Sequence, residues 1–224
     1  MPSVFFPADF NRSTIISFMD LLIRGVYDAQ TLETVQQLNV SRIGFDLRAT
    51  SLNLIPFRIL KDLIPQLKTN QNFIIFENDS LETVNSFLSL LGPDKNKFEL
   101  EFRDKQSFSY YAYVNHPFSW FFHPEGDWEG IISLPQLRTI VLPVKYEYAY
   151  QNLSKFWDMV QYRNLQVIVH VETFKDLELY VQEKNLILSV DLGRDFESSF
   201  RKIDQSRLSN LRIWRISNES ATGQ

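Results

Sequence analysis

Short apolar runs recur along the chain, and stretches with helical periodicity separate most of them. The eight clearest runs are Leu21–Val26, Arg42–Arg48, Phe73–Asn78, Lys97–Arg103, Thr139–Lys145, Gln166–Glu172, Leu186–Gly193 and Leu211–Ser217. Strands that alternate with helices pair in parallel through right-handed crossovers. Eight such units within 224 residues therefore predict an α/β protein built as a single (β/α)8 TIM-like barrel.

Several polar residues just after the predicted strands have the position and spacing of helix caps. Asp28 precedes a helix-like stretch, where its carboxylate can accept hydrogen bonds from the first amide groups of a helix. Asp79 with Glu82, and Thr173 with Asp176, have the spacing of a capping box. We therefore expect helices to begin at these places.

The regular alternation fails in residues 104–138. Nine of the chain's 32 aromatic residues fall within residues 104–130, where composition alone would place about four. They are Phe108, Tyr110, Tyr111, Tyr113, Phe118, Trp120, Phe121, Phe122 and Trp128. Residues 104–138 are interpreted as an irregular insertion, which makes Leu211–Ser217 the eighth strand. In the alternative, residues 117–122 are the fifth strand, Leu186–Gly193 is the eighth, and Leu211–Ser217 is an additional strand.

The role of these aromatic side chains is open in the same way. They can pack as a satellite core on the barrel, form a lid over its end, or provide the contact surface of a homodimer. The chain has enough apolar residues to bury a substantial core, and barrels of this length form one domain. We expect residues 1–224 to be a single domain in which residues 1–20 are an N-terminal extension.

Composition narrows the classes of function. A net charge of −4 provides no positive field that would attract nucleic acid. The absence of cysteine excludes disulfides, a thiol nucleophile and thiolate metal sites. The first ten residues carry no basic group, and Asp20 and Arg24 interrupt the apolar stretch that follows, so we expect neither a signal peptide nor a membrane span. A cytoplasmic protein without a cofactor is the expectation.

Residues 22–56 resemble a known enzyme family. The segment LIRGVYDAQTLETVQQLNVSRIGFDLRATSLNLIP is similar to the opening βαβ unit of phosphoribosylanthranilate isomerase, in its apolar spacing and in Gly25, Asp28, Gly44, Phe45 and Ser51. The family's pattern begins Lys-Ile-Cys-Gly-Ile and reaches Gly-Phe at the second strand. The resemblance implies a barrel related to these isomerases.

The residues that carry the family's chemistry are not retained. The resemblance places the general-base cysteine at Arg24, whose guanidinium stays protonated and cannot accept a proton. The family's substrate-contacting arginine falls near Asn53, and its catalytic aspartate has no counterpart in the strand that ends with Pro143 and Lys145. Phosphate capture by backbone amides relies on paired glycines, and none of the seven glycines here adjoins another. We therefore expect no isomerase activity.

Ionisable side chains gather where the predicted strands end, at the end of the barrel that carries ligand chemistry in this fold. They are Arg24, Asp46, Arg48, Glu77, Arg103, Lys145, His170, Glu172, Asp191 and Arg215. The predicted catalytic residues are His170, Asp191 and Asp46, because a carboxylate can orient an imidazole and adjust its pKa. The predicted substrate-binding residues are Arg24, Arg48, Ser51, Lys145 and Arg215. The alternative is that these charges neutralise one another in a polar layer of the barrel.

Three classes of function stay open, and whether the protein is an enzyme is open with them. The first is a diverged barrel that binds a small anionic metabolite, a phosphate or a carboxylate. The second is a non-catalytic barrel that binds another protein. The third is a divalent-metal sugar isomerase or hydrolase, with ligands from Glu77, His170, Glu172 and Asp191, although no tight ligand spacing supports a metal site.

Overall fold

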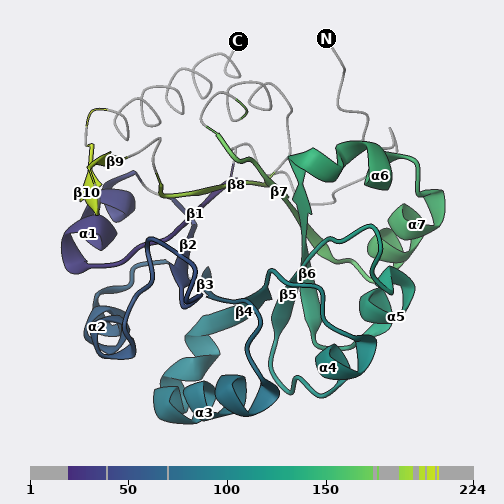
Figure 1. Ribbon diagram of the computed structural model, residues 1–224, viewed down its shortest axis with the longest axis horizontal. Coiled ribbons are helices and arrows are strands. Elements are labelled where there is room, and N and C mark those ends of the chain that lie inside the picture. Colours follow the sequence, from purple (N-terminus) through teal and green to yellow (C-terminus); the bar gives the residue numbers. More distant parts are fainter. Residues whose placement is uncertain are drawn as a thin grey trace.

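Eight parallel strands form a closed barrel in the computed structural model of the chain, which describes residues 20–38, 40–69, 71–173, 176, 187–193, 197–199, 201–204 and 206 (Figure 1). The barrel strands are β1 (Asp20–Arg24), β2 (Arg42–Asp46), β3 (Gln71–Phe76), β4 (Phe98–Phe102), β5 (Phe118–Phe121), β6 (Leu137–Pro143), β7 (Gln166–His170) and β8 (Ile187–Asp191). Each strand pairs with the next along the chain, and β8 pairs with β1 to close the ring. The predicted (β/α)8 barrel is confirmed.

Helices surround the ring and cover its outer face (Figure 1). The α-helices whose bounds lie within the described residues are α1 (Ala29–Gln37), α2 (Phe57–Leu63), α3 (Leu81–Leu91), α4 (Phe108–Ala112), α5 (Trp128–Ser133), α6 (Glu147–Gln151) and α7 (Ser154–Tyr162). The 3₁₀ helices are η1 (Ile64–Gln66), η2 (Gly92–Lys97) and η3 (Val144–Tyr146). A short antiparallel hairpin, β9 (Glu197–Ser199) and β10 (Lys202–Ile203), follows β8. Among the helices of the described ranges, none combines the length and apolar character that crossing a bilayer requires.

The predicted helix caps are found at two of the three places, and at the third the cap is the next residue. The Asp28 carboxylate accepts a hydrogen bond from the Thr31 amide and caps α1 as predicted. Thr173 and Asp176 exchange reciprocal hydrogen bonds of the capping-box kind. At α3 the prediction was off by one residue, because the cap is Ser80, whose hydroxyl accepts from the Thr83 amide.

The predicted insertion at residues 104–138 is wrong. This segment contains α4, β5, α5 and the first residues of β6, and β5 pairs in parallel with β4 and β6. The eighth strand is Ile187–Asp191, so the alternative assignment was correct for the fifth and eighth strands. Leu211–Ser217 lies outside the described residues, as does the predicted extension at residues 1–20 except for Asp20, which begins β1. The unit was hard to see because α4 has five residues and β5 has four, too few to show a period.

Most of the clustered aromatic residues belong to the core between the strands and their helices. Tyr111 stacks on Phe118 with ring centroids 5.8 Å apart, and Phe102 contacts both rings. Phe108 and Tyr113 are the members of the cluster with substantial exposure, at 39% and 74%. Packing in the core therefore explains most of the aromatic residues in this segment. A homodimer that forms through the segment stays a prediction.

The barrel interior has an apolar centre. Alternate residues of each strand point inward, and six of these form a separate buried cluster: Leu22, Phe73, Phe121, Val141, Ile168 and Ile187. Arg24, Ser189 and His170 follow at the next inward positions of β1, β8 and β7, toward the C-terminal ends of the strands. The barrel thus has an apolar plug below a polar layer.

Candidate functional site

Arg24 is the centre of the polar layer. It ends β1 and is fully buried, and its Nε and Nη2 donate hydrogen bonds of 2.9 and 2.7 Å to Glu101 Oε2 on β4. Gly44 on the neighbouring strand leaves room for the arginine, since a Cβ there would lie 2.8 Å from Arg24 Cγ. A buried guanidinium is tolerated only with such a partner, so Arg24 and Glu101 form one structural unit.

The ion pairing continues through Arg103. Its Nε donates to Glu101 Oε1 at 2.9 Å, and its two terminal nitrogens donate to both oxygens of Asp191 at 2.6 and 2.7 Å. This is the bidentate geometry that makes arginine–carboxylate pairs strong. Burial alone would raise the pKa of Asp191, but the Arg103 guanidinium outweighs it and holds that pKa below its ordinary value. Asp191 is therefore an anion whose oxygens are already occupied.

Arg48 completes the network. It makes a bidentate pair with Asp46 at the end of β2, with the shortest contact at 2.6 Å, and lies 3.8 Å from Asp191. We name the six residues Arg24, Asp46, Arg48, Glu101, Arg103 and Asp191 the ion network. It contains three cations and three carboxylates. The interpretation of mutually neutralising charges describes this arrangement well.

His170 ends β7 against the ion network. Its Nδ1 lies 3.3 Å from Arg24 Nη1 and 3.3 Å from the Ser189 hydroxyl, and its ring meets the Phe121 ring edge to face. Burial, together with the charges of Arg103 and Arg24, lowers the pKa of His170 well below 6.5, despite the opposing effect of Asp191. The imidazole is therefore neutral at physiological pH.

A cavity of about 310 Å³ opens above the ion network at the C-terminal ends of the strands. It is lined by Arg48, Glu77, Arg103, Phe121, His123, Lys145, Tyr146, His170, Val171, Glu172 and Asp191. The guanidinium of Arg103 lies 5.2 Å from the Phe121 ring centre. Lys145 and Glu172 form an ion pair of 3.5 Å in which both side chains are about half exposed. The charged groups that line the cavity thus differ greatly in burial and in the strength of their ion pairs.

The structure brings most of the predicted site residues together. His170, Asp191, Asp46, Arg24 and Arg48 meet in or against the ion network, and Lys145 lies at the cavity.

Ser51 is not part of this group. It lies in the loop after β2, where its hydroxyl accepts from the Asn53 amide. Asn53, at the position of the family's arginine, is buried and donates to the Leu192 carbonyl. Arg215 lies outside the described residues.

Two residues of the site were missed by sequence reasoning. Glu101 was passed over, although its alternation with Arg103 on β4 places both side chains on the inward face. His123 was obscured by the wrong assignment of β5, whose end it follows by two residues. The His123 Nε2 lies 3.0 Å from the Arg103 carbonyl, and burial lowers its pKa, so it is a second neutral imidazole at the cavity.

The predicted metal ligands do not converge. Glu77, His170, Glu172 and Asp191 all line the cavity. Within the described ranges, however, no three histidine, aspartate or glutamate side chains are grouped as a metal ion would require. Glu77 accepts a hydrogen bond from Thr50, and Asp191 is held by Arg103.

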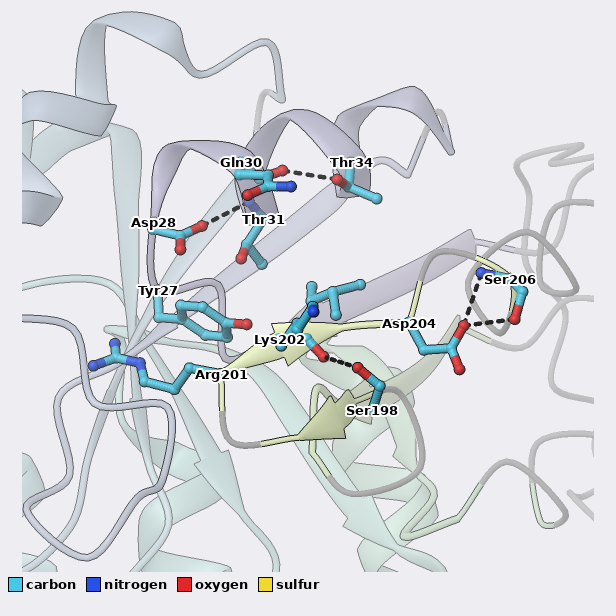
Figure 2. A pocket seen from close by; sticks show the side chains of 11 residues that line it. Tyr27, Asp28, Gln30, Thr31, Thr34, Ser198, Arg201, Lys202, Asp204 and Ser206 are labelled. Carbon is cyan, nitrogen blue, oxygen red and sulfur yellow. Dashed lines mark hydrogen bonds between the residues drawn. The ribbon is translucent and has the colours of Figure 1, made fainter.

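A second cavity, of about 540 Å³, lies between α1 and the β9–β10 hairpin (Figure 2). Its polar groups are largely engaged in local structure. Arg201 stacks over the Tyr27 ring and donates to the Leu54 carbonyl, Asp28 caps α1, and Asp204 binds Ser206. None of the predicted site residues lines it. We therefore place the candidate site at the end of the barrel.

Comparison with solved structures supports the assignment of the fold. The chain is 15% identical to phosphoribosyl anthranilate isomerase from Thermus thermophilus, with a TM-score of 0.63 over 89% of this chain and 99% of that one. The chain is 12% identical to TrpF from Jonesia denitrificans, with a TM-score of 0.65 over 89% of this chain and 98% of that one. A HpcH/Hpal aldolase/citrate lyase family protein from Burkholderia cenocepacia is 7% identical, with a TM-score of 0.57 over 92% and 96%. The chain therefore has a diverged barrel fold like that of phosphoribosylanthranilate isomerase.

Sequence comparison adds no closer relationship. No protein-family model matches the chain, and no curated protein matches it in sequence. At these identities the structural likeness concerns the fold alone. The likeness therefore assigns no function to this chain.

Proposed function

We propose that this protein is a phosphoribosylanthranilate-isomerase-like barrel that has lost the isomerase reaction and binds a small monocarboxylate at the C-terminal end of the barrel. The observation that carries the proposal is the ion network. It occupies the position of the family's catalytic base and neutralises the arginines that a phosphate would need.

Loss of the isomerase reaction follows from the state of Arg24. A general base must accept a proton and must reach the substrate. The guanidinium of Arg24 has no acceptor, is fully buried, and is bonded to Glu101. No described residue at the end of β1 can take over this role, because the next residue is Gly25.

The charge balance favours a monocarboxylate over a phosphate ester. Among the described residues that line the cavity, Arg48, Arg103 and Lys145 are matched by three carboxylates, and both histidines are neutral. A phosphate dianion would therefore meet no excess of positive charge. One isomerase structure of similar fold contains reduced 1-(O-carboxyphenylamino)-1-deoxyribulose 5-phosphate. We propose that this chain has given up the phosphate part of such a ligand.

Lys145 is the cation that a carboxylate would contact. The partly buried bidentate pairs of Arg103 and Arg48 would have to be broken to release a guanidinium, which costs more than opening an exposed pair. The pair of Lys145 with Glu172 is half exposed, and such pairs contribute about 0–1 kcal/mol. A ligand carboxylate can thus replace Glu172 as the partner of Lys145 at little cost.

The test is ligand-dependent thermal stability together with an isomerase assay. The probes are acetate, lactate and glycerate, compared with inorganic phosphate and ribose 5-phosphate. At about 100 times Kd a ligand stabilises the fold by about 2.7 kcal/mol, which corresponds to roughly 5–10 °C for a chain of this length. We expect such a shift with a hydroxylated monocarboxylate and no turnover of the isomerase substrate.

Two lysine variants make the test specific. Lys145→Met should weaken binding about tenfold or more, because a hydrogen bond to a charged group contributes about 1.5–3 kcal/mol. Lys155→Met is the matched control, since Lys155 forms an exposed ion pair with Glu129 away from the cavity. A larger shift with the phosphate compounds, or equal binding by Lys145→Met, contradicts the proposal.

A further inference from the structure

We infer that Arg24 fixes His170 as the tautomer with its proton on Nε2, so that the imidazole presents a hydrogen-bond donor to the cavity and recognises an acceptor oxygen of the ligand. Arg24 is thus a positioning residue that acts through His170. The tautomer follows from the ligand-free geometry, while the choice of ligand atom rests on the proposed function above.

Arg24 can only donate in its hydrogen bond with His170, and this determines the tautomer of the imidazole. An arginine side chain has five N–H donors and no acceptor. Since Arg24 Nη1 faces His170 Nδ1 at 3.3 Å, Nδ1 must accept, and the single proton of the neutral ring lies on Nε2. Ser189 is compatible with this arrangement, because its hydroxyl can donate to the Val169 carbonyl at 3.4 Å.

The Arg24 guanidinium has little freedom to rotate away from His170. Arg24 Nε and Nη2 are both bonded to Glu101, which also receives Arg103, so the plane of the guanidinium is fixed. The stem of Arg24 packs closely against Gly44, where a Cβ would lie only 2.8 Å from Arg24 Cγ. The position of Nη1 is therefore determined by bonds that do not involve His170.

The opposite nitrogen faces the cavity. His170 lines the cavity, and Nε2 has no hydrogen-bond partner among the described residues. An N–H group at this place binds a carboxylate, carbonyl or hydroxyl oxygen and repels an ammonium group. His123 offers the complementary function, because its Nε2 donates to the Arg103 carbonyl and leaves Nδ1 as an acceptor. A hydroxy-carboxylate can satisfy both rings.

The experiment is a long-range ¹H–¹⁵N correlation spectrum of the histidine rings in the full-length protein without ligand. The chain has three histidines, so His170→Gln identifies the His170 signals by their loss. His116 and His123 serve as internal references, since the Nε2 of each lies within hydrogen-bond distance of a backbone carbonyl. We expect the Nε2–H pattern for His170 at pH 7. An Nδ1–H pattern, or a charged imidazolium, would overturn the inference.

Variants then test the part played by Arg24. Arg24→Met combined with Glu101→Leu removes the donor and its counter-ion together, and replacing a buried ion pair by apolar residues is often tolerated. In this variant Nδ1 can donate to Ser189, and we expect the Nδ1–H tautomer to become populated. Ser189→Ala is the control that should keep the Nε2–H pattern. An unchanged tautomer in the double variant would show that Arg24 does not set it, and the wild-type spectrum tests the tautomer even if that variant does not fold.

Titration with glycerate separates this inference from the proposed function. A shift of the Nε2–H resonance on binding supports both. If the ligand-free spectrum shows the Nε2–H tautomer but glycerate and lactate leave it unchanged, the proposed function is refuted while the tautomer assignment stands.

Discussion

Glu99 allows a quantitative test of the buried charges in this barrel. It lies on β4, two residues before Glu101, on the same inward face. Its Oε1 is buried without a hydrogen-bond partner among the described residues. Burial, reinforced by the Glu101 carboxylate, raises the pKa of Glu99 from 4.5 to about 7. Between pH 4.5 and about pH 7 the folded protein therefore holds a proton on Glu99 that the unfolded chain releases.

The sign and size of the effect on stability follow from linkage. A pKa raised on folding contributes stability below the unfolded value of 4.5, and this contribution disappears as the pH rises through about 7. Since a tenfold change in proton affinity corresponds to about 1.4 kcal/mol, the contribution amounts to about 3 kcal/mol, most of which is lost between pH 5 and pH 8. Glu99→Gln keeps a neutral group of similar shape and removes the titration.

The assay is urea unfolding of the wild type and Glu99→Gln at several pH values from 5 to 8. Relative to the wild type, the variant should gain about 2–3 kcal/mol of unfolding free energy over this range. Glu82→Gln is the control, because hydrogen bonds lower the pKa of the exposed Glu82 on α3, so that its titration lies below pH 5 and its difference from the wild type should stay nearly constant from pH 5 to 8. A difference between wild type and Glu99→Gln that does not change with pH would refute the reasoning.

Three further predictions concern the ion network and the chemistry. Gly44→Ala should lower the unfolding free energy by about 1–3 kcal/mol, measured in urea, because the new methyl group overlaps the Arg24 side chain. Arg24→Met should cost about 3–5 kcal/mol by leaving Glu101 without this partner, and adding Glu101→Leu should recover most of the loss. Purified protein should not convert phosphoribosylanthranilate above the buffer rate, and saturable turnover abolished by His170→Gln would contradict this.

The fold could be predicted where periodicity and cap chemistry act over enough residues. The strands ending at Arg24 and His170 were visible as apolar runs, and the carboxylate of Asp28 marked the start of α1. The unit around Phe118–Phe121 was predicted only as the alternative, because its strand and both helices are short, and because aromatic residues on both faces of the strand conceal its alternation. Shortness, rather than irregularity, hid this βα unit.

The site could be predicted as a gathering of charges but not as a set of pairs. Barrel topology alone places Arg24, Arg48 and Asp191 at the same end. Which carboxylate each arginine binds depends on closure of the barrel, which brings Arg24 onto Glu101, a residue 77 positions away. Asp191 does not orient His170 through a hydrogen bond as predicted. Asp191 is bound by Arg103, and His170 Nδ1 faces Arg24 instead.

The pairing of Arg24 with Glu101 also limits which single substitutions the barrel tolerates at Arg24. Arg24→Cys would supply a thiol where the isomerases have their base, but it would remove two hydrogen bonds from a fully buried carboxylate. The intermediate would be less stable by about 3–5 kcal/mol, a large part of the total stability of an ordinary domain. A thiol at this position therefore needs coordinated changes at both Arg24 and Glu101, and the ion pair makes the single substitution costly.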